Sequence, residues 1–232
     1  EEQRHKEFVT DENTDEQATP PVPLNKRKVL IIEDDNDVRE FLKEEIGHYF
    51  EVVAEADGIS GFERAQTYDA DLIICDVLMP GMTGFEVTKK LKNEFATSHI
   101  PIILLTALNM EEKYLEGIES GADAYITKPF SVGIFKVTVK NILANRALLR
   151  QAYNSIEDEE KHLPANCSNT LDWKFIASVK ECIEKNMGDL DFTVDILSSQ
   201  HHMSRTSFYN KLKALTGYAP ADYIRMIRLQ HA

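Results

Sequence analysis

Five short apolar segments alternate with segments of helical spacing between residues 28 and 150. The apolar segments predict strands at 28–32, 52–54, 71–75, 100–105 and 124–126, and the intervening segments predict helices at 38–47, 60–66, 85–95, 111–120 and 131–150. Such alternation is typical of a parallel, doubly wound α/β sheet with helices on both faces, because right-handed crossovers return the chain to the same end of the sheet. All five strands are therefore expected to end at one edge.

Chemically active side chains follow four of these strands. Glu33 and Asp34 come after the first strand, Asp76 after the third, Thr106 after the fourth and Lys128 after the fifth. Three carboxylates at one edge repel one another unless a cation lies among them, and hard oxygen ligands suit Mg²⁺. Thr106 and Lys128 could bind phosphoryl oxygens while Asp76 acts as the nucleophile, which indicates phosphoryl transfer to a carboxylate.

Each of these residues also has a simpler explanation when taken alone. Asp76 could begin a turn, the acids at 33–35 and Thr106 could cap helices, and Lys128 could be a solvated charge. Residues 35–37 have the spacing of a DxD phosphatase motif, but the strand ends two residues too early, and an EF-hand would need glycine at the sixth position from Asp35. The convergence at one edge favours the phosphoryl-transfer interpretation.

The rest of the chain differs in composition. Residues 1–25 are acidic and rich in proline, which indicates a linker or tail, and residues 151–170 indicate a second linker. The three cysteines are scattered without metal or redox spacing, which is typical of a reducing compartment. No apolar run approaches the roughly 20 residues of a membrane helix. We therefore expect a cytoplasmic chain without membrane contact, or the cytoplasmic end of a membrane-bound protein.

Residues 171–232 predict a smaller all-α domain. Thr193 should cap a short helix, and residues 201–203 should form a turn. Ser204 should then cap a second helix that ends before Gly217. Two short helices joined by a tight turn can place the second helix in the major groove of DNA, although a plain helical bundle has the same pattern. The formal charge of the whole chain is −13, whereas residues 204–232 hold five basic residues and one acidic residue. The predicted DNA contacts are Arg205, Thr206, Ser207, Asn210, Lys211 and Lys213.

Residues 31–35 (IIEDD), 76–86 (DVLMPGMTGFE), 105–107 (LTA) and 121–130 (GADAYITKPF) resemble the receiver domain of two-component response regulators, a flavodoxin-like fold, over residues 26–150. The resemblance implies that Asp76 accepts a phosphoryl group from a histidine kinase. It implies Mg²⁺ bound by Asp34, Asp76 and the backbone carbonyl of Leu78, with Glu33 acting through water. It also implies that Lys128 contacts the phosphate, that Thr106 and Tyr125 form a switch pair, that the Lys128–Pro129 peptide is cis, and that activation produces a homodimer.

Residues 192–217 resemble the first helix-turn-helix of AraC-type regulators, and residues 218–229 resemble the helix that links it to the second. His202 stands where that family usually has a turn glycine, which strains the left-handed conformation by about 1 kcal/mol. A second helix-turn-helix does not follow before Ala232. The resemblance therefore implies an incomplete DNA-binding domain with weak affinity for promoter DNA.

Together these features predict a phosphorylation-dependent transcription regulator, a phosphoacceptor rather than a turnover enzyme. The acidic start without methionine also fits the receiver and output end of a hybrid histidine kinase. The alternative is a receiver whose helical output binds a protein rather than DNA.

Overall fold

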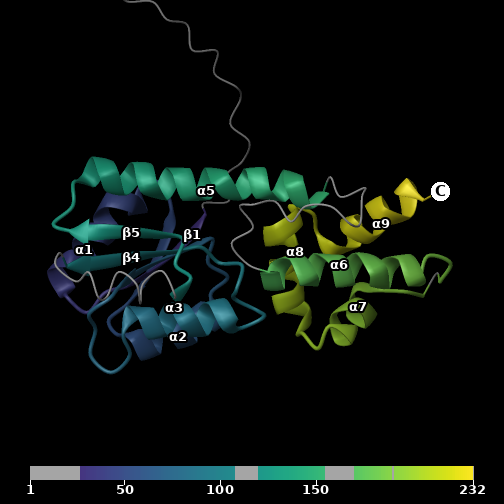
Figure 1. Ribbon diagram of the computed structural model, residues 1–232, viewed down its shortest axis with the longest axis horizontal. Coiled ribbons are helices and arrows are strands. Elements are labelled where there is room, and N and C mark those ends of the chain that lie inside the picture. Colours follow the sequence, from purple (N-terminus) through teal and green to yellow (C-terminus); the bar gives the residue numbers. More distant parts are fainter. Residues whose placement is uncertain (1–26, 108–119, 155–169, 190, 232) are drawn as a thin grey trace, which may run out of the picture.

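The computed structural model describes residues 27–107, 120–154, 170–189 and 191–231. Figure 1 shows a sheet covered by helices, beside a second part made of helices alone. The long helix α5 (Val132–Asn154) runs from the sheet towards this second part and contacts its helix α8 (Arg205–Thr216). The predicted helix at 111–120 lies outside the described residues, apart from Ser120.

The sheet has five parallel strands in the order β2-β1-β3-β4-β5. This confirms the predicted α/β fold class. The strands are β1 (Lys28–Ile32), β2 (Glu51–Glu55), β3 (Leu72–Asp76), β4 (Ile102–Ala107) and β5 (Ala124–Lys128). The described helices around them are α1 (Asn36–Gly47), α2 (Gly58–Thr67), α3 (Gly84–Asn93) and α5.

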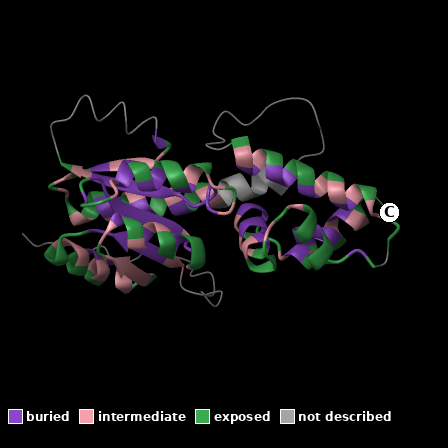
Figure 2. Cartoon of the chain, turned by 90° about the horizontal axis from the view of Figure 1, so that it is seen from below, coloured by how far each residue is buried: buried purple, intermediate pink, exposed green. Residues whose placement is uncertain are grey.

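Two hydrophobic cores hold the sheet between its helices. Leu30 and Ile32 of β1 pack with α2 and α3 on one face, while Val29 and Ile31 pack with α1 and α5 on the other. This division follows from the alternation of side chains along a strand. Figure 2 shows burial along the strands, and every residue of the central strand β3 is buried. A strand buried on both faces reads as a continuous apolar run, which is why β3 was readable from the sequence.

Polar caps fix where the helices begin. Asp35 accepts hydrogen bonds from the backbone of Asp37 and Val38 at the start of α1, so the capping interpretation is confirmed for this acid. Thr83 and Glu86 form a capping box at the start of α3. These caps satisfy backbone N–H groups that have no partner within the helix.

Gly84 sets how closely α3 approaches the end of β3. A Cβ at this position would lie 2.2 Å from the backbone carbonyl oxygen of Asp76. We expect Gly84→Ala to lower the free energy of unfolding by about 1–3 kcal/mol, because backbone must move to relieve the overlap. Gly47→Ala is the control, because nothing lies within 4 Å of a Cβ added at this position. This substitution should stabilise α1 by about 0.5–1 kcal/mol. Urea unfolding measures both, and equal effects would contradict the prediction.

The second part consists of α6 (Thr170–Lys185), α7 (Val194–Gln200), α8 and α9 (Pro220–Gln230), which enclose their own hydrophobic core. Thr193 and Ser204 cap α7 and α8 as predicted, and Gly217 ends α8 in the left-handed conformation. His202 adopts a φ of 53°, and it is the one non-glycine residue with positive φ among those described. Over the same residues, no helix is both long enough and apolar enough to cross a membrane.

Candidate functional site

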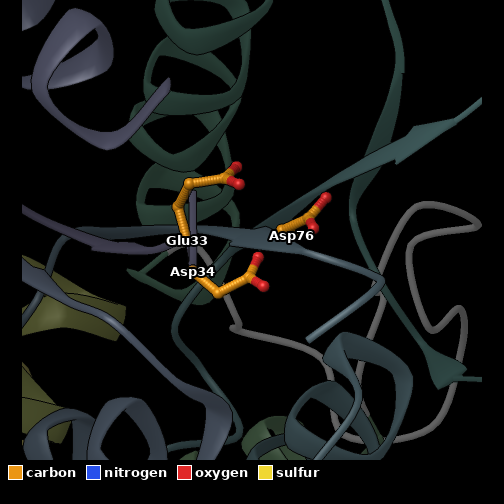
Figure 3. Close-up of side chains that lie close together, drawn as sticks. All are labelled: Glu33, Asp34 and Asp76. Atoms are coloured by element: carbon orange, nitrogen blue, oxygen red, sulfur yellow. The ribbon is translucent and has the colours of Figure 1, made fainter. Parts of the chain in front are cut away.

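Three carboxylates meet at the carboxyl edge of the sheet. One ligand oxygen each of Glu33, Asp34 and Asp76 lies within 4.8 Å of the other two (Figure 3). The pairing of Ile32 with Cys75 places the ends of β1 and β3 next to each other, so the residues that follow converge. Glu33 is 1% exposed and Asp76 is 6% exposed, whereas Asp34 is open to solvent. The site is therefore a cluster of acids that is partly buried and partly open to solvent.

Lys128, at the end of β5, bridges two of these acids. Its Nζ lies 2.8 Å from Glu33 Oε2 and 2.9 Å from Asp76 Oδ1. Burial alone would lower the pKa of Lys128, but the hydrogen bonds and negative charges of the two acids outweigh it and raise the pKa. The lysine thus remains a cation beside Asp76, in position to contact an anion bound there. Its peptide bond to Pro129 is cis, as the resemblance implied.

The donor set fits a hard divalent cation. The Oε1 atom of Glu33 is buried and has no hydrogen-bond partner among the residues that the structure describes. Burial raises the pKa of Glu33, Lys128 lowers it, and the charge of Asp76 raises it again. A cation among these acids would relieve their repulsion, and a water on that cation could donate to Glu33 Oε1. Asp34 and Asp76 supply carboxylate oxygens of the kind that Mg²⁺ prefers.

The remaining predicted residues of this site lie on neighbouring elements. Thr106 follows Leu105, the partner of Asp76 between β3 and β4, and it is half-buried. Tyr125 is half-buried in β5 and packs against the core on the α2 and α3 face. Leu78 lies two residues beyond Asp76 with its side chain exposed. The contact of its carbonyl with a metal remains a prediction.

The predicted DNA contacts separate into two groups. Arg205, Thr206 and Lys213 are exposed on α8, and Ser207 and Asn210 are half-buried. Lys211, by contrast, is 0% exposed and forms a 2.8 Å ion pair with Asp172 of α6. This corrects the prediction for Lys211, because a side chain that is fully enclosed by protein cannot contact a DNA phosphate in this arrangement.

Sequence reasoning did not find the polar cluster around Lys211. Besides Asp172, Lys211 Nζ donates to Ser98 Oγ at 2.8 Å and to the carbonyl oxygen of Phe95 at 2.6 Å. Both of these partners precede β4 and lie more than a hundred residues from Lys211 in the chain. No local pattern signals a contact over that separation.

Comparison with known proteins identifies the first part. The sequence model of the response regulator receiver domain matches residues 29–140. The fold is similar to the crystal structure of the signal receiver domain of a signal transduction histidine kinase from Syntrophus aciditrophicus. The two share 29% identity at a TM-score of 0.50, over 60% of this chain and 98% of that one.

Two curated relatives extend the similarity along most of the chain. Histidine kinase P4 of Formosa agariphila is 37% identical over 209 residues, which is 89% of this chain but only 15% of the kinase. The DNA-binding dual master transcriptional regulator RpaA of Synechocystis is 32% identical over 212 residues, covering 87% of this chain and 82% of that protein.

Proposed function

The chain belongs to the response regulators through its receiver domain, and from this premise we propose that it is a phosphorylation-dependent transcription regulator. The observation that carries the proposal is the cluster formed by Glu33, Asp34, Asp76 and Lys128. In this proposal residues 26–150 form the receiver and residues 171–232 the output. The phosphodonor is the phosphohistidine of a histidine kinase.

Asp76 is the proposed phosphoacceptor. A carboxylate oxygen of Asp76 forms a bond to phosphorus while the bond between phosphorus and the donor nitrogen breaks, and the electron pair of that bond stays on the histidine. Lys128 Nζ already lies 2.9 Å from Asp76 Oδ1. Its ammonium can therefore exchange this contact for a hydrogen bond to an oxygen of the incoming phosphoryl group. The ion pairs of Lys128 with Glu33 and Asp76 keep these groups in place before the donor arrives.

Magnesium and the switch pair complete the proposed mechanism. Asp34, Asp76 and the carbonyl of Leu78 would hold Mg²⁺, with Glu33 acting through water, and the ion would neutralise charge that develops on the phosphoryl oxygens. The Thr106 hydroxyl would donate to the phosphate, and the Tyr125 ring would turn inward behind it. This rearrangement would change the surface of the receiver and promote a homodimer.

Phosphorylation with a small-molecule donor tests this proposal. Incubation with acetyl phosphate should add a single phosphoryl group in the presence of Mg²⁺ and none in the presence of EDTA, because the cluster of acids repels an anionic donor without the ion. Intact-protein mass spectrometry measures the addition, and hydroxylamine should remove it, as expected for an acyl phosphate. Labelling that is equal with Mg²⁺ and with EDTA would contradict the magnesium site.

The output is proposed to bind promoter DNA through α8. The similarity to RpaA, which is named as a DNA-binding regulator, supports this role. Exposed Arg205 and Lys213 on α8 offer phosphate contacts, and the capped α7 and α8 flank a tight turn.

A protein-binding output is the second candidate. The observation that favours it is the burial of Lys211, since α8 already uses this side chain to contact protein. Titration of the protein against a fluorescent DNA duplex at several salt concentrations separates the two candidates, since only a DNA-binding output should bind the duplex with an affinity that falls as salt rises.

A further inference from the structure

A cavity lies between the amino edge of the sheet and helix α8. It has a volume of about 350 Å³ and is lined by residues of the receiver, of α5 and of α8. Among the receiver residues, Lys28 begins β1, and Ile100 and Pro101 directly precede β4, so they lie at the edge opposite Asp76. Figure 1 shows the arrow of β5 pointing away from α8, which agrees with this placement. The cavity is therefore separate from the cluster of acids around Asp76.

Basic side chains outnumber acidic ones in the wall of this cavity. Four basic and two acidic residues line it, namely Arg27, Lys28, Arg146, Lys213, Asp69 and Asp71. None of the four basic side chains forms an ion pair with a residue that the structure describes, so the two acids act on them only from a longer distance. The whole chain carries a formal charge of −13. The excess of positive charge is thus a local feature of the cavity.

Neutral groups hold three of these basic side chains in place. Arg27 Nη1 donates to the carbonyl oxygen of Leu143 in α5 at 3.2 Å. Lys28 Nζ lies 5.4 Å from the ring centroid of Tyr68, and Lys213 Nζ lies 5.6 Å from that of Tyr209. A carbonyl or a ring positions a cation without cancelling its charge, and an arginine has five N–H donors. Donors therefore remain for a ligand.

The charge of Arg146 acts on its buried neighbours. Burial lowers the pKa of His99, which also lines the cavity, and the charges of Arg146, Lys211 and Lys92 lower it further. Burial likewise lowers the pKa of Lys92 and of Lys211, and Arg146 adds to that effect. The Nδ1 atom of His99 is buried without a hydrogen-bond partner among the described residues. An anion beside Arg146 would relieve this accumulation of positive charge.

We propose that this cavity binds a small oxyanion with two or more negative charges, held between the receiver and α8. The volume of 350 Å³ lies near the lower end of the range for ligand sites, and it corresponds to about twelve water molecules in the liquid. The ligand is therefore a compact molecule, such as a pyrophosphate, a small phosphorylated metabolite or a tricarboxylate. Guanidinium groups bind the oxygens of phosphates and carboxylates in pairs, and ammonium groups bind them as point charges.

The site is complete only when α8 packs against the receiver. Arg27 and Lys28 belong to the receiver, Arg146 to α5 and Lys213 to α8. A ligand that contacts all three elements binds the packed arrangement and stabilises it by mass action. The concentration of the anion would thus control how firmly the two parts of the chain are joined.

Isothermal titration calorimetry with two anions tests the site. Pyrophosphate and citrate are titrated separately into the full chain at fixed ionic strength, in buffer stripped of divalent ions, so that the acids around Asp76 repel both anions. Arg146→Gln and Lys213→Gln each remove one positive charge from the wall, the first in α5 and the second in α8. Lys140→Gln is the matched control, because Lys140 is an exposed cation of α5 that does not line the cavity.

We expect one anion to bind with a stoichiometry of one, and Arg146→Gln and Lys213→Gln each to weaken its binding about tenfold, as the loss of a charge-assisted hydrogen bond predicts. Lys140→Gln should leave the affinity unchanged. Tighter binding of pyrophosphate would assign the site to phosphorylated ligands, and tighter binding of citrate would assign it to carboxylates. Absence of binding by both anions, or equal weakening by all three substitutions, would overturn the site. Weakening by Arg146→Gln but not by Lys213→Gln would overturn the contribution of α8.

Discussion

Replacing Asp76 with asparagine is expected to reduce phosphorylation by acetyl phosphate to the background of the assay. The substitution removes the attacking carboxylate oxygen and one anionic ligand of the proposed Mg²⁺ site at the same time, while the shape of the side chain is nearly unchanged. Asp76 is 6% exposed and forms an ion pair with Lys128, so the variant also removes a negative charge beside that lysine, although the amide oxygen can still accept its hydrogen bond. No other carboxylate among the described residues occupies the end of the central strand β3.

Asp37→Asn is the control for this experiment. Asp37 is an exposed acid in the first turn of α1, close to the site in sequence but not among its three clustered carboxylates. Its replacement should leave labelling unchanged. Thermal unfolding of both variants establishes that they are folded, and undiminished labelling of folded Asp76→Asn would show that Asp76 is not the phosphoacceptor.

The second large effect is expected at the buried pair of Lys211 and Asp172. Lys211→Met should lower the free energy of unfolding of the helical part by about 3–5 kcal/mol, because it leaves Asp172 buried without its cation. Asp172→Leu combined with Lys211→Met should recover most of that loss, because both charges are then gone. Urea unfolding followed by the fluorescence of Trp173, the single tryptophan of the chain, reports on the helix that carries Asp172.

An exposed ion pair in the same region provides the comparison. Arg205 and Asp195 join α8 to α7 at 3.1 Å, with both side chains more than half exposed. Arg205→Gln should cost less than about 1 kcal/mol, since exposed pairs contribute little. A double-mutant cycle gives the coupling energy of each pair. Equal coupling in the two pairs would contradict the role assigned to burial.

The sheet and its acidic edge were predictable because their signals are local. Each strand is a short apolar run, and parallel strands must end together, so Glu33 and Asp76 were expected to meet without any knowledge of their contacts. The helix starts at Thr193 and Ser204 were likewise readable from single capping residues. The switch roles of Thr106 and Tyr125 and the metal contact of the Leu78 carbonyl came from the resemblance and remain predictions.

The burial of Lys211 could not be predicted from the local sequence. It lies three residues after Phe208 and four before Leu215, both buried, so its spacing already placed it beside the apolar face of α8. Its charge nevertheless suggested solvent and DNA. The partners that make its burial possible are Asp172 on another helix and Ser98 in the receiver, and only the folded chain brings them together.

Strand β4 lies between Asp76 and the contact made by Lys211. It begins four residues after Ser98, which accepts a hydrogen bond from Lys211, and it ends one residue beyond Thr106, so this contact lies at the opposite edge of the sheet from Asp76. If phosphorylation at one edge changes the stability of the contact at the other, thermodynamic reciprocity requires the contact to change the stability of the phosphorylated conformation by the same factor. A substitution that alters how α8 packs against the receiver would then also alter how strongly the receiver favours its phosphorylated conformation.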